Sequence, residues 1–219
     1  MKKKFAFTMI ELVFVIVILG ILASIAMGRM ERDLHQEASS TMLSHIRLAQ
    51  QLAISDNKHR SDNNPWWQRA YWQVQFRQCL NSEWSYRVGS DIGLDGGVNS
   101  LSKLESAINP IDGKYLFTTD CQNLGNDESP SVRLSKKFGI QNINSTCTQT
   151  IGFDYLGRPH RGVNYNSANF SKIMTNDCVL TFILSTDING DGSVDNNDSF
   201  SIRIQAETGH AFIVGQENS

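Results

Sequence analysis

The stretch that most constrains this chain is an almost unbroken apolar run near its N-terminus. Residues 7–27 read F-T-M-I-E-L-V-F-V-I-V-I-L-G-I-L-A-S-I-A-M, and only Thr8, Glu11 and Ser24 interrupt the apolar residues and glycine. As a helix, the run would be about 31 Å long, close to the roughly 30 Å of a bilayer's hydrocarbon core. Three lysines precede it and favour a cytoplasmic N-terminus. The sequence therefore predicts one transmembrane helix followed by an external domain.

Glu11 is the unusual residue of this run. A carboxylate at mid-bilayer costs about 2.5–3.5 kcal/mol, so its presence calls for a partner or a function. A secretory signal also combines a basic start with an apolar core, and Ala23-Ser24-Ile25-Ala26 could serve as its cleavage site. Composition alone leaves that alternative open.

The residues around the start of the run carry a more specific pattern. Lys-Phe-Ala6 followed by Phe7-Thr8-Met9-Ile10-Glu11 and the apolar run resembles the type IV pilin and pseudopilin superfamily. The resemblance implies that a prepilin peptidase cleaves between Ala6 and Phe7 and that Phe7 is N-methylated. It also implies that Glu11 pairs with the N-terminal amine of a neighbouring subunit.

The same resemblance implies a cellular location and a set of partners. We expect a single-pass protein of the bacterial inner membrane, with a cytoplasmic N-terminus and a periplasmic head, that later enters a pilus or pseudopilus. The implied partners are other pilin or pseudopilin subunits, prepilin peptidase and the inner-membrane assembly platform.

An amphipathic pattern continues directly from the apolar run. Leu34, Ala38, Met42, Ile46, Ala49 and Ala53 recur at three- and four-residue spacing, and Leu48 and Leu52 broaden the stripe. The pattern predicts one helix from Phe7 to about Ile54, its first half in lipid and its second half against a globular head. We divide the chain into a leader (1–6), a transmembrane or filament-core segment (7–28), an amphipathic half (29–55) and a head (56–219).

Strand signals dominate the head. Alternation of apolar and polar residues predicts a hairpin from Trp72–Phe76 and Trp84–Val88, with Gln73, Gln75 and Arg77 outward. Further strands are expected at 114–119, 131–134, 150–156, 178–184, 199–204 and 209–214, and residues 89–130 are expected to be mostly irregular. One helix followed by many short strands is an α+β plan, with the helix covering an antiparallel sheet or sandwich.

Charge and cysteine content set further limits. The 219 residues have a net charge of −2, which argues against bulk electrostatic attraction to nucleic acid. All four cysteines, Cys79, Cys121, Cys147 and Cys178, follow the apolar run, and no two form a C-x-x-C pair. An even count in an exported domain favours two disulfides, but the sequence does not choose among the three pairings.

Motifs in the C-terminal part of the chain resemble a smaller group within this superfamily. Phe153-Asp154, Gly157-Arg158-Pro159 and a later Thr208-Gly209 turn are similar to motifs of the GspH/FimT group of minor pilins and pseudopilins. DNA-binding members of that group use basic residues near the final turn, where this chain has His210. This difference weakens the case for nucleic-acid binding. The weak candidate residues for it are Arg158, His160 and Arg161.

Residues 187–198 form the one metal-binding motif. Oxygen-bearing side chains stand at positions 1, 3, 5, 9 and 12, and a glycine stands at position 6, which is the spacing of an EF-hand-type or dockerin-type calcium loop. The predicted ligands are Asp187, Asn189, Asp191, Asp195, Asp198 and the backbone carbonyl of Ser193. Because the flanks read as strands, we expect a calcium-binding hairpin; an Asn/Gly/Asp-rich turn without metal is the alternative.

These features favour a non-enzymatic, structural subunit of a type II secretion pseudopilus or a type IV pilus. A second hypothesis is a pilus-tip module that binds DNA or a surface. No H-E-x-x-H, G-x-S-x-G or P-loop pattern occurs in the chain, which disfavours an anchored enzyme.

Overall fold

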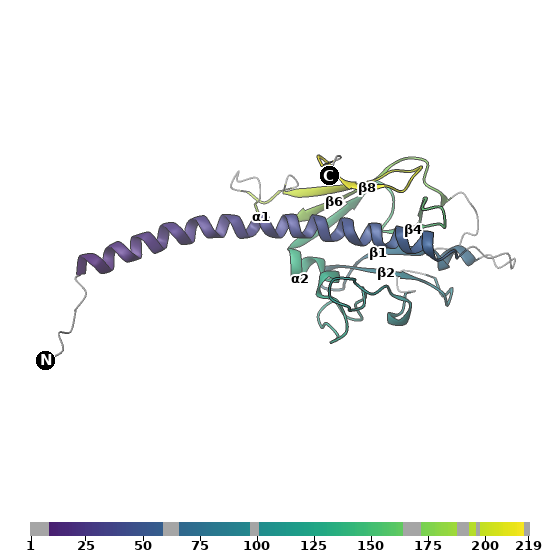
Figure 1. The fold of residues 1–219 in the computed structure, drawn as a ribbon, viewed down its shortest axis with the longest axis horizontal. Coiled ribbons are helices and arrows are strands. Elements are labelled where there is room, and N and C mark those ends of the chain that lie inside the picture. The colour runs from purple at the N-terminus through teal and green to yellow at the C-terminus, as the bar shows by residue number, and fades with distance from the viewer. Residues whose placement is uncertain are drawn as a thin grey trace.

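The structure is a computed structural model that describes residues 9–58, 66–96, 101–163, 172–187, 193–195 and 198–216, apart from the side chains of residues 24–33. A 47-residue helix, α1 (Met9–Ser55), runs the length of the molecule, and a head of β-strands packs against its C-terminal half (Figure 1). At 1.5 Å per residue the helix is about 70 Å long. The predicted continuous helix is confirmed over the described residues.

The second half of α1 is buried as its periodicity predicts. Ala38, Met42, Ile46, Ala49 and Ala53 are each at most 2 % exposed, and Leu34, Leu48 and Leu52 pack at the edge of the same core. Arg47 also ties the helix to the last strand, because its guanidinium donates two hydrogen bonds, of 3.0 and 2.8 Å, to the carbonyl of Ala211.

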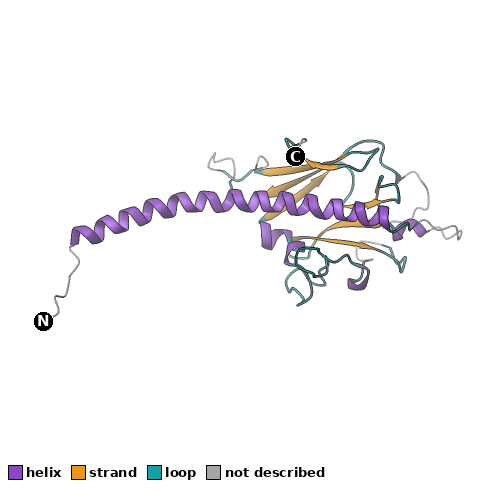
Figure 2. Cartoon of the chain, in the orientation of Figure 1, coloured by secondary structure: helices purple, strands orange, loops and turns teal. Residues whose placement is uncertain are grey.

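Two four-stranded antiparallel sheets form the head (Figure 2). The first has the order β2-β1-β4-β5, made by β1 (Trp72–Gln78), β2 (Trp84–Ser90), β4 (Thr150–Phe153) and β5 (Pro159–Arg161). The second has the order β3-β6-β7-β8, made by β3 (Ile140–Ser145), β6 (Cys178–Leu184), β7 (Ser199–Ile204) and β8 (Ala211–Ile213). The expected α+β class is therefore confirmed.

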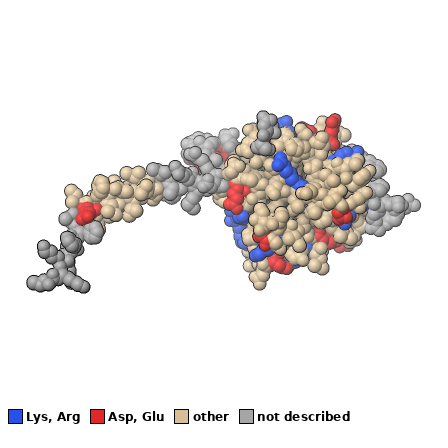
Figure 3. All heavy atoms as spheres, viewed as in Figure 1, with Lys and Arg blue, Asp and Glu red and all other residues tan. Residues whose placement is uncertain are grey.

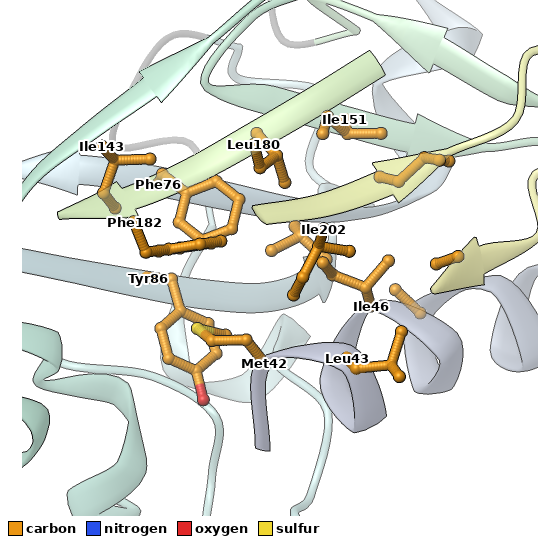
Figure 4. Close-up of a cluster of buried hydrophobic side chains, with 14 of the residues drawn as sticks. Met42, Leu43, Ile46, Phe76, Tyr86, Ile143, Ile151, Leu180, Phe182 and Ile202 are labelled. Atoms are coloured by element: carbon orange, nitrogen blue, oxygen red, sulfur yellow. The ribbon is translucent and has the colours of Figure 1, made fainter. Parts of the chain in front are cut away.

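One hydrophobic core joins α1 to both sheets. Met42 and Ile46 of the helix point toward Tyr86, Phe182 and Ile202 of the strands (Figure 4). Across the sheets, the rings of Phe76 and Phe182 are 5.6 Å apart between centroids, an edge-to-face distance that suits aromatic packing. The helix and the two sheets therefore fold as one unit.

The predicted hairpin forms in register, with Val74 opposite Val88 and Phe76 opposite Tyr86. The expectation that its polar side chains face solvent is wrong, because Gln73 and Gln75 are at most 1 % exposed. Residues 101–118 cover that face, where Arg87 of β2 donates hydrogen bonds to the carbonyls of Leu101 and Thr118. Both faces of this sheet are thus buried.

Two further strand predictions are wrong. Residues 114–119 form isolated bridges, such as Tyr115 to Ile108, and no regular strand. Residues 131–134 belong to the 3-10 helix η3 (Pro130–Val132) and the start of α2 (Leu134–Phe138). Leu134 and Phe138 lie four residues apart on one face of α2 and are both fully buried, so core packing favours a helical turn there.

Two disulfides fix the head, Cys79–Cys121 and Cys147–Cys178. The first joins the end of β1 to the irregular region, and the second joins the segment after β3 to the start of β6. In the chain-entropy model, closing loops of 42 and 31 residues stabilises a fold by roughly 3–4 kcal/mol each. The pairing that the sequence left open is thereby assigned.

Candidate functional sites

The first half of α1 projects from the head and presents an apolar surface. Its large side chains from Met9 to Leu22 are 40–87 % exposed, and a Cβ added at Gly20 would meet nothing within 4 Å. An exposed apolar surface of this extent marks a region that contacts another protein or lipid. Figure 3 shows charges of both signs scattered over the visible face of the head, and the tan part of the projecting helix carries one acidic group.

Glu11 lies in the first turn of this helix, on the exposed apolar half. A carboxylate is favourable there, since the N-terminus of a helix carries a partial positive charge. The predicted processing residues, Ala6 and Phe7, lie outside the described residues. Within the described part of the chain, no helix combines the length and the hydropathy needed to cross a membrane.

The Phe153-Asp154 and Gly157-Arg158-Pro159 motif forms a tight turn between β4 and β5, organised by the carboxylate of Asp154. That side chain is 1 % exposed and accepts hydrogen bonds from the backbone amides of Leu156 and Arg158, at 3.0 and 2.9 Å. Its second oxygen lies 2.8 Å from Nη2 of Arg158 and 3.1 Å from Nε2 of His160. Burial raises the pKa of Asp154, but the hydrogen bonds from His160 and Arg158 outweigh it and lower the pKa overall.

Gln50 of α1 brings the two C-terminal motifs together. Its side-chain amide donates to the carbonyl of Gly157 at 3.0 Å and to the carbonyl of Thr208 at 2.9 Å. Gly157 and Gly209 both have positive φ, and a Cβ at Gly209 would overlap the carbonyl oxygen of Gly157. The contact requires glycine at both positions. The motif residues are thus a structural clamp that fixes both turns against the helix.

The weak nucleic-acid candidates do not form a basic patch. His160 is fully buried against Asp154 and the ring of Tyr71, whose centroid is 5.0 Å away. Arg158 is paired with the same carboxylate, and only Arg161 of the three is exposed. A phosphate backbone needs several accessible cations, which this arrangement does not offer.

The predicted calcium loop connects β6 and β7, so its flanks are strands as expected. Asn189 and Asp191 lie outside the described residues. Asp198 is fully buried; its Oδ2 accepts a hydrogen bond from the amide of Asp195 at 3.0 Å, and its carbonyl accepts one from Leu184 at 2.8 Å. Among the described residues, no three His, Cys, Asp or Glu side chains gather as a metal site.

Sequence reasoning missed two polar residues on α1 that link the helix to the head. Gln50 gave no signal, because an isolated glutamine on an amphipathic helix looks like a solvent position. His45 is fully buried, and its Nδ1 lies 2.6 Å from the Tyr86 hydroxyl. His45 stands three residues after Met42 and four before Ala49, on the same helix face as these core residues, and that spacing is the signal that could have indicated burial.

A long N-terminal helix that projects from a head of antiparallel sheets, with an acid in its first turn, defines a pilin-like architecture. Residues 1–27 match the family model described as the prokaryotic N-terminal methylation motif. The chain therefore carries the prepilin signal of type IV pilins and pseudopilins, and this signal indicates a structural, pilin-like subunit rather than an enzyme. Comparisons with curated proteins and with solved structures gave no match.

Proposed function

We propose that this protein is a minor pilin or pseudopilin that is built into the filament of a type II secretion system or a type IV pilus through the first half of α1. The observation that carries the proposal is the methylation motif leading directly into an exposed apolar helix. Burying that surface against neighbouring helices would remove most of its large apolar side chains from water. Before assembly, the same segment would be held in the inner membrane.

In the proposed assembly, Glu11 sets the axial register. Prepilin peptidase cleaves after Ala6 and leaves Phe7 with a methylated N-terminal amine. Within an apolar bundle, a carboxylate and an ammonium group each carry a large desolvation cost, and pairing them on adjacent subunits offsets it. Only one axial offset between subunits brings the two groups together, so the pair would select that offset.

We also propose that calcium orders the β6–β7 loop. The support is the spacing of its oxygen-bearing side chains and the strand ends on which the loop stands. Without a cation, four carboxylates within twelve residues repel one another, so bound calcium would stabilise the hairpin. Asp187 and Asp198 are the first and last residues of this loop, Ser193 and Asp195 lie between them, and Asn189 and Asp191 would complete the ligand set.

Cysteine cross-linking in cells tests the assembly. The four native cysteines are paired, so a single introduced cysteine reports its own surroundings. Under mild oxidation, Val15→Cys is expected to form a disulfide with a cysteine introduced into the N-terminal helix of another pilin subunit of the same machine, whereas Leu104→Cys, at an 87 % exposed head position, serves as the control. Cross-links from the head variant and none from the helix variant would contradict assembly through α1.

A further inference from the structure

The two sheets have four edge strands, β2 and β5 in the first sheet and β3 and β8 in the second. Other parts of the chain bond to the outer side of three of these strands, at the carbonyls of Val88 in β2, Pro159 in β5 and Ala211 in β8. The fourth edge strand, β3, differs from them, because the outer side of its second half has unpaired backbone groups among the described residues.

The hydrogen bonds between β3 and β6 show which groups of β3 point outward. The amide of Thr146 donates to the carbonyl of Val179 in β6 at 3.1 Å. In an antiparallel pair every second residue bonds to the partner strand, so Asn144 also bonds to β6. The backbone groups of the intervening Ile143 and Ser145 therefore point away from β6.

Three of these four outward groups have no hydrogen-bond partner in the part of the chain that the structure describes. The amide of Ile143 donates to the side-chain oxygen of Asn142 at 2.9 Å. The carbonyl of Ile143 and the amide and carbonyl of Ser145 remain, an acceptor, a donor and an acceptor in strand geometry. Ser145 is partly exposed, and its neighbours Asn144 and Thr146 are exposed. An extended backbone is the ligand that complements such a row.

The sequence of this edge lacks the residues that usually keep a sheet edge from pairing. Residues 140–150 read I-Q-N-I-N-S-T-C-T-Q-T and include neither a charged residue nor a proline. Native proteins protect open edges with charges, prolines or bulges. The register shift in β3 lies between Ile140 and Asn142, before the unpaired groups, which stand on the regular part of the strand. Residues 143–145 can therefore pair with a further strand.

The side chains around the edge favour an uncharged partner. The neighbouring strand β6 reads C-V-L-T-F-I-L and, like β3, has no charged residue. The side-chain amide of Asn142 lies 3.4 Å from the side-chain oxygen of Asn144 on the exposed face of β3. A charged side chain on an added strand would find no opposite charge on β3 or β6, whereas serine, threonine, asparagine or valine would suit these neighbours.

A second copy of this chain does not suit the edge. Antiparallel pairing of two β3 strands in one sheet places a two-fold axis perpendicular to the sheet, which reverses every direction that lies in the sheet plane. Because α1 runs alongside the strands of the second sheet (Figure 1), the helices of the two copies would point in opposite directions. They could not enter one membrane or filament in the same orientation; this step rests on the proposed function.

We propose that the outer edge of β3, at residues 143–145, binds an extended, uncharged segment of another protein as a fifth strand of the second sheet. The sheet order places β3 at the edge opposite β8, which Arg47 ties to α1. Three strand spacings of about 4.8 Å separate the two edges. Burial of the projecting half of α1 in a filament therefore leaves the β3 edge accessible.

Amide hydrogen exchange of the full chain in detergent micelles, read residue by residue by NMR, tests the site. The probe is a capped six-residue peptide of alternating threonine and valine; its fully N-methylated form and versions with lysine or glutamate in place of threonine are the comparisons. We expect the first peptide to slow exchange of the Ser145 amide at least about fivefold in a saturable way. The Asn144 amide, already bonded to β6, should be unchanged. The charged peptides should bind more weakly, and the N-methylated one should not bind.

Lysine substitutions assign the effect to the edge. Asn144→Lys places a cation beside the unpaired groups and should weaken peptide binding at least about tenfold. Asn126→Lys adds the same charge at an exposed position of the irregular region and should leave binding unchanged. Retained protection of the other β3 and β6 ladder amides shows that the Asn144 variant is folded.

The proposal is rejected if no peptide protects Ser145, if the N-methylated peptide acts as strongly, if a charged peptide binds more tightly, or if Asn144→Lys binds as the parent does. Protection that appears without peptide and grows with protein concentration would show that two copies pair, and it would also overturn the proposal. Failure of strand binding would leave the Val15→Cys cross-linking result untouched, so the two proposals fail separately.

Discussion

His45 of α1 and Tyr86 of β2 form a fully buried polar contact, with Nδ1 and the hydroxyl 2.6 Å apart. The pair lies where the helix meets the first sheet, among core residues such as Met42 and Phe76. An imidazole in these surroundings must stay neutral, because a buried cation loses its hydration. Burial lowers the pKa of His45 from 6.5 to about 4, opposed by Asn109 and Asp112.

This contact predicts a stability that depends on pH. Between pH 6.5 and about 4 the unfolded chain binds a proton at His45 that the folded chain does not, so the free energy of unfolding falls as the pH is lowered through that window. The loss is at most about 3 kcal/mol. His35, half-buried with its pKa also lowered by burial, adds to the same trend. Denaturant unfolding of His45→Gln should show a shallower pH slope than the parent, and an equal slope would contradict the assignment.

Gln50→Ala should release the two C-terminal turns from the helix. Loss of the hydrogen bonds to the carbonyls of Gly157 and Thr208 is expected to lower the free energy of unfolding by about 1–2 kcal/mol. Gln51→Ala, at the next position of α1, which is exposed, is the matched control. It should lower the free energy of unfolding by at most about 0.5 kcal/mol. Urea denaturation of both variants measures the difference. Equal losses of stability would contradict a clamping role for Gln50.

Calcium should raise the melting temperature of the protein, because an ion bound only to the folded β6–β7 loop shifts the folding equilibrium. Asp191→Ala is expected to abolish this rise. Asp127→Ala, at an exposed carboxylate that pairs with Lys103 elsewhere on the head, should preserve it. A calcium titration without any thermal shift in the parent protein would exclude the site.

Glu11→Gln should impair assembly without affecting the fold of the head, since residue 11 lies on the projecting half of α1. Glu37→Gln removes an exposed acid of the same helix that pairs with Lys137 at 2.8 Å, and it should assemble normally. Filament yield measured by shearing and immunoblotting distinguishes the variants. Normal yield from Glu11→Gln would contradict the proposed pairing with the N-terminal amine.

The sequence predicted those elements whose hydrophobic period is strong and local. The stripe from Ala38 to Ala53 and the alternation from Trp72 to Phe76 both carried enough signal, and the structure confirms the helix and the hairpin. The strand β3 was missed because Gln141, Asn142 and Asn144 have low strand propensity, and pairing with β6 overrides it. Its register depends on a strand some forty residues later in the chain.

The same distinction between local and long-range signals separates the candidate sites that the sequence predicted from those that it missed. The processing signal and the calcium spacing are linear patterns, so the sequence alone could state them. The Gln50 clamp depends on contacts between segments far apart in the chain, as does the Cys79–Cys121 link across 42 residues. Such contacts arise from the tertiary fold, and no local spacing in the sequence encodes them.

The mass of the mature N-terminal peptide tests the central claim most directly. Protein isolated from membranes or filaments of the native cell, digested and analysed by mass spectrometry, should yield a peptide that begins at Phe7 and carries one methyl group on its amine. A mature chain that begins after Ala26, or that retains residues 1–6, would contradict the claim that the apolar helix is a processed pilin segment.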